Sequence, residues 1–71
     1  MDRKPVTSMN LASVGYDAQK KTLEVEFKMG GVHQYAEVPP RVHTELINAP
    51  SVGAYFHQNI RYKYPSKKVS P

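Results

Sequence analysis

Three histidines are the side chains of this sequence best suited to proton transfer or metal binding. They are His33, His43 and His57. Two histidines and a lysine can cleave RNA by general acid–base catalysis, and imidazole is a common zinc ligand. However, the spacing of the histidines matches no metal-ligand pattern, and there is no cysteine to complete a zinc site. We therefore expect no metal, no cofactor and no catalytic residue, and a small nuclease using His43 or His57 is the least favoured class.

Aromatic and basic side chains interleave toward the C-terminus in a way that suits nucleic-acid binding. The chain has five tyrosines, two phenylalanines and no tryptophan. Proteins that bind single-stranded RNA stack bases on such rings and hold phosphates with lysine and arginine. The candidate nucleic-acid-binding residues are Arg61, Tyr62, Lys63, Tyr64, Lys67, Lys68, His33 and Tyr35.

The positive charge is concentrated in the last third of the chain. The formal net charge is +4, and residues 1–45 contain six basic and six acidic side chains. Residues 46–71 contain four basic side chains and no acidic one. A local positive field of this kind favours a polyanionic partner, although a short basic tail can also be simply solvated. Arg3, Lys4, Lys20 and Lys21 would extend this surface if the fold brings the segments together.

Length and hydropathy restrict the class of protein. Seventy-one residues predict a single small domain over 1–71, with an ordered core from about 6 to 65 and a flexible basic tail over 66–71. No apolar run approaches the ~20 residues of a membrane span, and the N-terminus lacks the apolar segment of a secretion signal. With no cysteine for disulfides, we expect a cytoplasmic protein with no membrane contact and no small-molecule substrate.

A β-hairpin is the element around which the rest of the chain is organised. Apolar and charged residues alternate over 22–29, which is the period of a strand with one buried face. Gly30 and Gly31 supply the positive φ angles of a tight turn, and a second strand runs from Val32 to Val38 before Pro39. Residues 8–16 predict a third, preceding strand, in which Gly15 marks a bulge or a close backbone approach.

The length of the hairpin loop decides where Tyr35 lies. A two-residue Gly30–Gly31 loop places His33 and Tyr35 on the face of Glu24 and Glu26, whereas an odd loop places Tyr35 in the core. We favour the core, because two carboxylates would make the open face repulsive to phosphate.

Two short helices follow the hairpin. Pro40 suits the first turn of a helix that Pro50 ends. Ser51 is a plausible N-cap for a second helix that continues through Tyr64 to Pro65. The predicted fold is α+β, a three-stranded antiparallel meander packed against two short C-terminal helices. The predicted core contains Leu11, Val14, Leu23, Val25, Phe27, Val38, Leu46, Phe56 and Ile60.

The order of these motifs resembles the KTSC domain from about Ser8 to Pro65. The resemblance rests on Leu11-Ala-Ser-Val-Gly-Tyr-Asp17, Leu23-Glu-Val-Glu-Phe27, Gly31-Val-His-Gln-Tyr35, Val38-Pro39, Ser51-Val-Gly-Ala-Tyr-Phe56, Ile60-Arg61 and Tyr64-Pro65. The family is named for its place at the C-terminus of some lysyl-tRNA synthetases, and it also occurs as small bacterial and phage proteins. His33 stands where the family has the first tyrosine of a Tyr-x-Tyr pair, and His57 where it has asparagine.

The resemblance implies RNA as a partner through the synthetase context and adds no catalytic residue. We therefore expect a small non-catalytic domain that binds nucleic acid, RNA rather than DNA, through its basic and aromatic C-terminal surface. The alternative is a protein–protein interaction module that docks through an exposed sheet edge or an aromatic patch.

Overall fold

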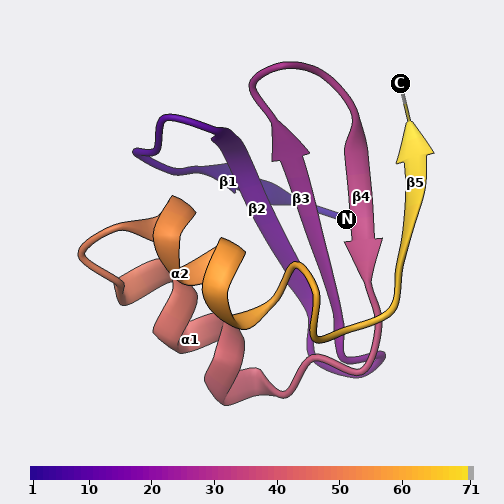
Figure 1. Cartoon of the computed structure of the whole chain (residues 1–71). Helices are drawn as coiled ribbons and strands as arrows, with labels where there is room; N and C mark the ends of the chain where they lie inside the picture. The colour runs from indigo at the N-terminus through magenta and orange to yellow at the C-terminus, as the bar shows by residue number, and fades with distance from the viewer. Residues whose placement is uncertain (71) are drawn as a thin grey trace.

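A computed structural model describes residues 1–70 as a five-stranded antiparallel sheet with two helices packed against one face (Figure 1). The elements are β1 (Arg3–Pro5), β2 (Leu11–Asp17), β3 (Thr22–Phe27), β4 (Val32–Tyr35), α1 (Pro40–Asn48), α2 (Val52–Asn59) and β5 (Ser66–Ser70). The spatial order of the strands follows the chain, from β1 at one edge to β5 at the other. The predicted α+β class with two helices is confirmed.

The prediction of a three-stranded sheet is wrong, because both ends of the chain add an edge strand. β1 pairs with β2, and β5 pairs with β4 from Ser66 opposite Tyr35 to Ser70 opposite Val32. Both strands lie outside the ordered range 6–65 that the sequence predicts, and β5 occupies positions 66–70 of the predicted tail. Position 71 of that tail lies outside the described residues. Every side chain of β5 is exposed, so no apolar alternation marked it as a strand.

The helices begin where the sequence predicts, but the second ends earlier. Pro40 is the first residue of α1, and the Ser51 hydroxyl accepts a hydrogen bond from the Ala54 N–H at the start of α2. α2 ends at Asn59 rather than continuing to Tyr64. A turn follows, closed by a 3.1 Å hydrogen bond from the Lys63 N–H to the Ile60 carbonyl. This turn directs the chain back to the sheet, where β5 begins.

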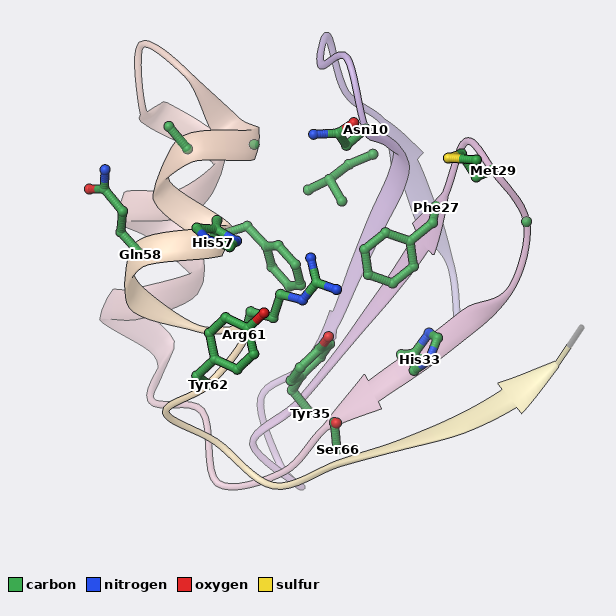
Figure 2. Close-up of a pocket in the computed structure, with 15 residues that line it drawn as sticks. Asn10, Phe27, Met29, His33, Tyr35, His57, Gln58, Arg61, Tyr62 and Ser66 are labelled. Atoms are coloured by element: carbon green, nitrogen blue, oxygen red, sulfur yellow. The ribbon is translucent and has the colours of Figure 1, made fainter.

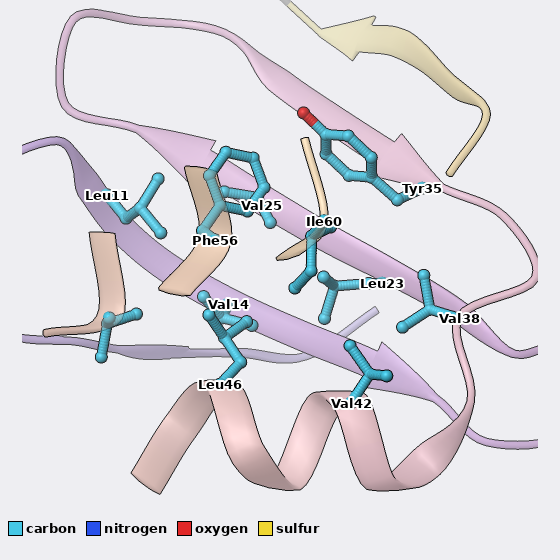
Figure 3. Close-up of a cluster of buried hydrophobic side chains, with 11 residues drawn as sticks. Leu11, Val14, Leu23, Val25, Tyr35, Val38, Val42, Leu46, Phe56 and Ile60 are labelled. Atoms are coloured by element: carbon cyan, nitrogen blue, oxygen red, sulfur yellow. The ribbon is translucent and has the colours of Figure 1, made fainter. Parts of the chain in front are cut away.

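The core lies between the helices and the facing side of the sheet (Figure 3). Eight of the nine predicted core residues are buried, and the ninth, Phe27, is partly buried against them. Val42 on α1 and Val52 on α2 complete the helix side of the core. Phe27 is only partly buried because it lines a cleft at the margin of the core.

Tyr35 belongs to the core, as the favoured interpretation predicted. The Phe27 N–H donates to the Gly31 carbonyl at 3.0 Å, which leaves three residues between them. This odd loop places Tyr35 opposite Leu23, and the tyrosine is only 3% exposed. Gly30 and Gly31 have φ angles of 109° and 92°, as a tight hairpin requires.

On the opposite face of the sheet, polar side chains form a hydrogen-bonded row across neighbouring strands. The Arg3 guanidinium donates to Glu24, and the Gln34 amide donates to the other carboxylate oxygen of Glu24 at 2.9 Å. Gly15 lies between Arg3 and Glu24 in the strand register, so no side chain separates them. The close backbone approach predicted at Gly15 is confirmed, since an added Cβ would lie 2.6 Å from the Asp2 carbonyl oxygen.

No helix within residues 1–70 combines the length and the apolar character needed to cross a bilayer.

Candidate functional site

A cleft of about 860 Å³ lies at the margin of the core, lined by residues of α2, the turn after it, and the β3–β4 part of the sheet (Figure 2). We call it the α2 cleft. Its lining residues are Asn10, Leu11, Phe27, Met29, Gly30, His33, Tyr35, Gly53, Ala54, Phe56, His57, Gln58, Arg61, Tyr62 and Ser66. None of these carries a carboxylate, and Arg61 carries a permanent positive charge. The cleft thus combines an apolar wall with a cationic group.

Tyr35 and Arg61 bring two hydrogen-bond donors into the α2 cleft from different parts of the fold. Tyr35 comes from β4 and Arg61 from the turn after α2, and Figure 2 shows both polar ends inside the cleft. Burial raises the pKa of the Tyr35 hydroxyl, and the positive charge of Arg61 partly opposes that rise. The hydroxyl therefore remains protonated at neutral pH and can donate to an anion beside Arg61.

Arg61 also belongs to an aromatic group at the mouth of the cleft. Its guanidinium carbon lies 5.5 Å from the centre of the Tyr62 ring, within the range of a cation–π contact. His57 meets the same ring edge to face, with 5.6 Å between ring centres. Within residues 1–70 Arg61 makes no ion pair, and Tyr62 remains 76% exposed. Charge and ring surface are both accessible to a ligand.

His33 occupies the sheet side of the same cleft. Its ring meets Phe27 edge to face at 5.2 Å between centres. Its Nδ1 is buried and has no hydrogen-bond partner within residues 1–70. A buried polar atom without a partner costs free energy that water or a ligand can recover. Lys68 on β5 pairs with His33 in the strand register, which adds a second positive charge near this side of the cleft.

The structure separates the remaining candidate residues. Lys67 lies opposite Gln34, in the polar row that contains Glu24, so it faces away from the cleft. Lys63 is exposed in the turn after α2, next to the cleft but outside its lining. Tyr64 packs against the core and is only partly exposed. The structure therefore brings together Arg61, Tyr62, His33 and Tyr35, with Lys63 and Lys68 nearby.

The predicted nucleic-acid-binding set includes only four of the lining residues, His33, Tyr35, Arg61 and Tyr62. Among the lining residues outside that set are Asn10, Phe27 and His57, of which His57 was considered only as a nuclease residue. Phe27 alternates with charged residues, a pattern that predicts a core position. His57 and Arg61 are four residues apart, a spacing that places two side chains on one side of a helix and its continuation. That spacing could have identified His57. Asn10 precedes β2, and no local pattern marks it.

The three histidines do not lie together in the structure. His33 and His57 both line the α2 cleft, whereas His43 stacks on Tyr16 at 4.6 Å between ring centres and 11° between planes. Burial lowers the pKa of His43, which favours its neutral form. Residues 1–70 contain no group of three or more histidine or carboxylate side chains arranged to hold a metal ion.

Comparisons with known proteins identify relatives along nearly the whole chain. The family model described as the KTSC domain matches residues 7–64. A KTSC domain protein of Yersinia pestis has a crystal structure that superposes with a TM-score of 0.95, at 36% identity, over 97% of each chain. An uncharacterised protein of Stutzerimonas stutzeri is 40% identical over 90% of this chain and 94% of its own length.

Segments of larger enzymes are also similar. A lysine–tRNA ligase of Trichormus variabilis is 44% identical over 55 residues, which are 78% of this chain but only 10% of the ligase. A lysine–tRNA ligase of Nostoc punctiforme is 37% identical over 94% of this chain and 12% of the ligase. Similar sequences thus make up nearly the whole of a protein of this size and a small part of these larger enzymes. Because the family model covers most of the chain, this protein belongs to the KTSC domain family.

Proposed function

We propose that this domain is a non-catalytic binding module for single-stranded RNA. The observation that supports the proposal most directly is the α2 cleft, where Arg61 lies among aromatic rings without an ion pair within residues 1–70 and no lining residue is acidic. Lys63 and Lys68 lie close to this cleft and extend the positive charge along the surface. Lysine and arginine next to stacking rings form the usual combination for single-stranded nucleic acid.

The distribution of the acidic residues favours the same partner. Glu24 and Glu26 belong to the opposite face of the sheet, where Arg3 and Gln34 donate to Glu24 and Ser13 donates to one oxygen of Glu26. Glu45 accepts a hydrogen bond from Tyr55 between the two helices. These carboxylates do not line the cleft, so they repel a phosphate there less than carboxylates within the cleft would.

The similar proteins are the reason for proposing RNA as the nucleic acid that is bound. The larger relatives are lysine–tRNA ligases, enzymes whose names specify an RNA substrate. A domain attached to such an enzyme is well placed to hold RNA, and we extend that role to the present chain. On this proposal the domain contributes affinity for RNA, and its partner performs any chemistry.

A titration with a short single-stranded RNA at two salt concentrations tests the proposal. Amide shifts should cluster at Arg61, Tyr62, Lys63 and Lys68, and the logarithm of the affinity should fall with that of salt by roughly 0.7 per phosphate contact. The double change Lys63→Glu with Lys68→Glu should weaken binding at least about tenfold at low salt. A single-stranded DNA of the same sequence should bind more weakly.

A matched control separates local contacts from net charge. Lys4 lies on β1 at the far edge of the sheet, and Lys20 lies in the β2–β3 turn. Lys4→Glu with Lys20→Glu removes the same charge, yet should retain most of the affinity. RNA that causes no shift even at low salt would refute the proposal, and equal losses in the two double variants would show only nonspecific charge attraction.

Pairing of the β5 edge with a strand of another protein is the alternative function. β5 ends the sheet, and its Val69 side chain is 41% exposed. An added strand could pair with such an edge. However, Lys67 and Lys68 are the kind of edge side chains that discourage strand addition, so we favour RNA. The affinity for a protein partner should fall less than the affinity for RNA when salt is added or when the lysines are changed to glutamate.

A further inference from the structure

The α2 cleft is larger than a phosphate-binding site needs to be. Its volume of about 860 Å³ falls within the ~300–1,000 Å³ typical of small-molecule sites. Leu11, Phe27, Met29 and Phe56 contribute apolar surface to its walls. A ligand with a flat or apolar part in addition to a negative charge would match both the apolar walls and Arg61.

The polar groups of the cleft are placed for such a ligand. Arg61 and the Tyr35 hydroxyl form one donor pair, and Figure 2 shows them between the sheet and the turn after α2. Phe27 lies on the sheet side and Tyr62 on the helix side. His33 adds a buried Nδ1 with no partner within residues 1–70. The charged donor suits the phosphate of a nucleotide, and the aromatic rings suit its base.

We propose that the α2 cleft binds one nucleotide unit, with its phosphate at Arg61 and the Tyr35 hydroxyl and its base against Phe27 and Tyr62. This inference rests on the proposed RNA-binding function and specifies how one unit of the strand is held. Neighbouring nucleotides would follow the surface of Lys63 and Lys68 outside the cleft.

Free nucleotides test this inference without a long RNA. The full chain is titrated with the four nucleoside 5′-monophosphates, the corresponding nucleosides and inorganic phosphate, with amide and side-chain NMR shifts as the readout. At least one monophosphate should shift Phe27, His33, Tyr35 and Arg61 together. It should bind about tenfold or more tightly than its nucleoside or phosphate alone, because the two contacts reinforce each other.

Two variants probe the donor pair. Arg61→Gln should weaken monophosphate binding about tenfold or more, whereas Arg41→Gln, on α1 and outside the cleft, should not change it. Tyr35→Phe keeps the buried ring and should weaken binding by a smaller factor. Equal binding of phosphate and monophosphate, or shifts confined to Lys63 and Lys68, would overturn the inference. Cleft shifts caused by a tetraglutamate peptide and by no nucleotide would also overturn it, in favour of a protein partner.

The outcomes for the cleft and for RNA are separable. If single-stranded RNA binds without cleft shifts, and Arg61→Gln retains the parent's affinity, the nucleotide inference fails while RNA binding stands. If monophosphates bind in the cleft but RNA does not bind at either salt concentration, the RNA function fails while the nucleotide site stands.

Discussion

The guanidinium of Arg3 in β1 contacts the carboxylate of Glu24 in β3, with 2.5 Å between Nη1 and Oε2, across the whole width of β2. Gly15 makes this possible, because it occupies the position between them and has no side chain. Burial alone would raise the pKa of Glu24, but hydrogen bonds from Gln34 and Arg3, with the positive charges of Arg3 and the N-terminus, more than offset it. The pKa of Glu24 is therefore lower than usual.

This low pKa predicts that the protein loses stability in acid. The folded protein binds a proton at Glu24 less readily than the unfolded chain, whose glutamate has a pKa of about 4.3. The stabilisation is present above that value and is lost as the pH falls through the lower folded pKa. Between pH 7 and pH 2.5, the free energy of unfolding measured in urea should fall less in Glu24→Gln than in the parent protein. Glu37→Gln, at an exposed position, should retain the parent's acid dependence, and identical curves for all three proteins would contradict the prediction.

Gly15→Ala should destabilise the protein by about 1–3 kcal/mol, as overpacking commonly does. The new Cβ would lie 2.6 Å from the Asp2 carbonyl oxygen and 2.9 Å from Arg3 Cγ, so β1 would have to move. Gly53→Ala is the matched control, because its Cβ would meet only the Ser8 hydroxyl at 3.0 Å and alanine favours the helix. Thermal unfolding measures both changes. An alanine at 15 that is as well tolerated as one at 53 would show that β1 shifts at little cost.

His43 should titrate below the usual histidine pKa of about 6.5, because burial against Tyr16 disfavours its charged form. The unfolded chain then binds the proton more readily, so this contribution to stability is fully present above about pH 6.5. It is lost as the pH falls through the folded pKa. The proton shift of the His43 ring against pH measures this pKa directly. A midpoint at or above 6.5 would contradict the prediction.

A chain ending at Pro65 should retain its fold but expose β4. All β5 side chains are exposed, so their removal takes no residue from the core. The β4 amides that pair with β5 should exchange with solvent faster, while amides in β2 and β3 should keep most of their protection. Hydrogen exchange measured by NMR tests this, with circular dichroism as the check on folding. Loss of cooperative unfolding would instead show that β5 is required for the fold.

Local patterns in the sequence predicted the central part of the fold. Alternation over β3, the Gly30–Gly31 turn, and the prolines and serine around the helices each depend on interactions between near neighbours. The sequence did not predict the edge strands β1 and β5, because they form through backbone pairing with β2 and β4 and not through a buried apolar face. β1 contains Pro5, and β5 presents only exposed side chains, so neither shows a buried face in the sequence.

The sequence by itself determined the family, the α+β class, the buried face of the hairpin and the residues rich in positive charge. The tertiary structure alone decided which of those residues share a surface. It placed Arg61 beside Tyr35 and His33 from a distant strand, brought Phe27 and His57 into the same cleft, and turned Lys67 to the other face. The physical reason is that a side chain's type and period are local, whereas a cleft forms from strand register, loop parity and helix ends that packing sets together.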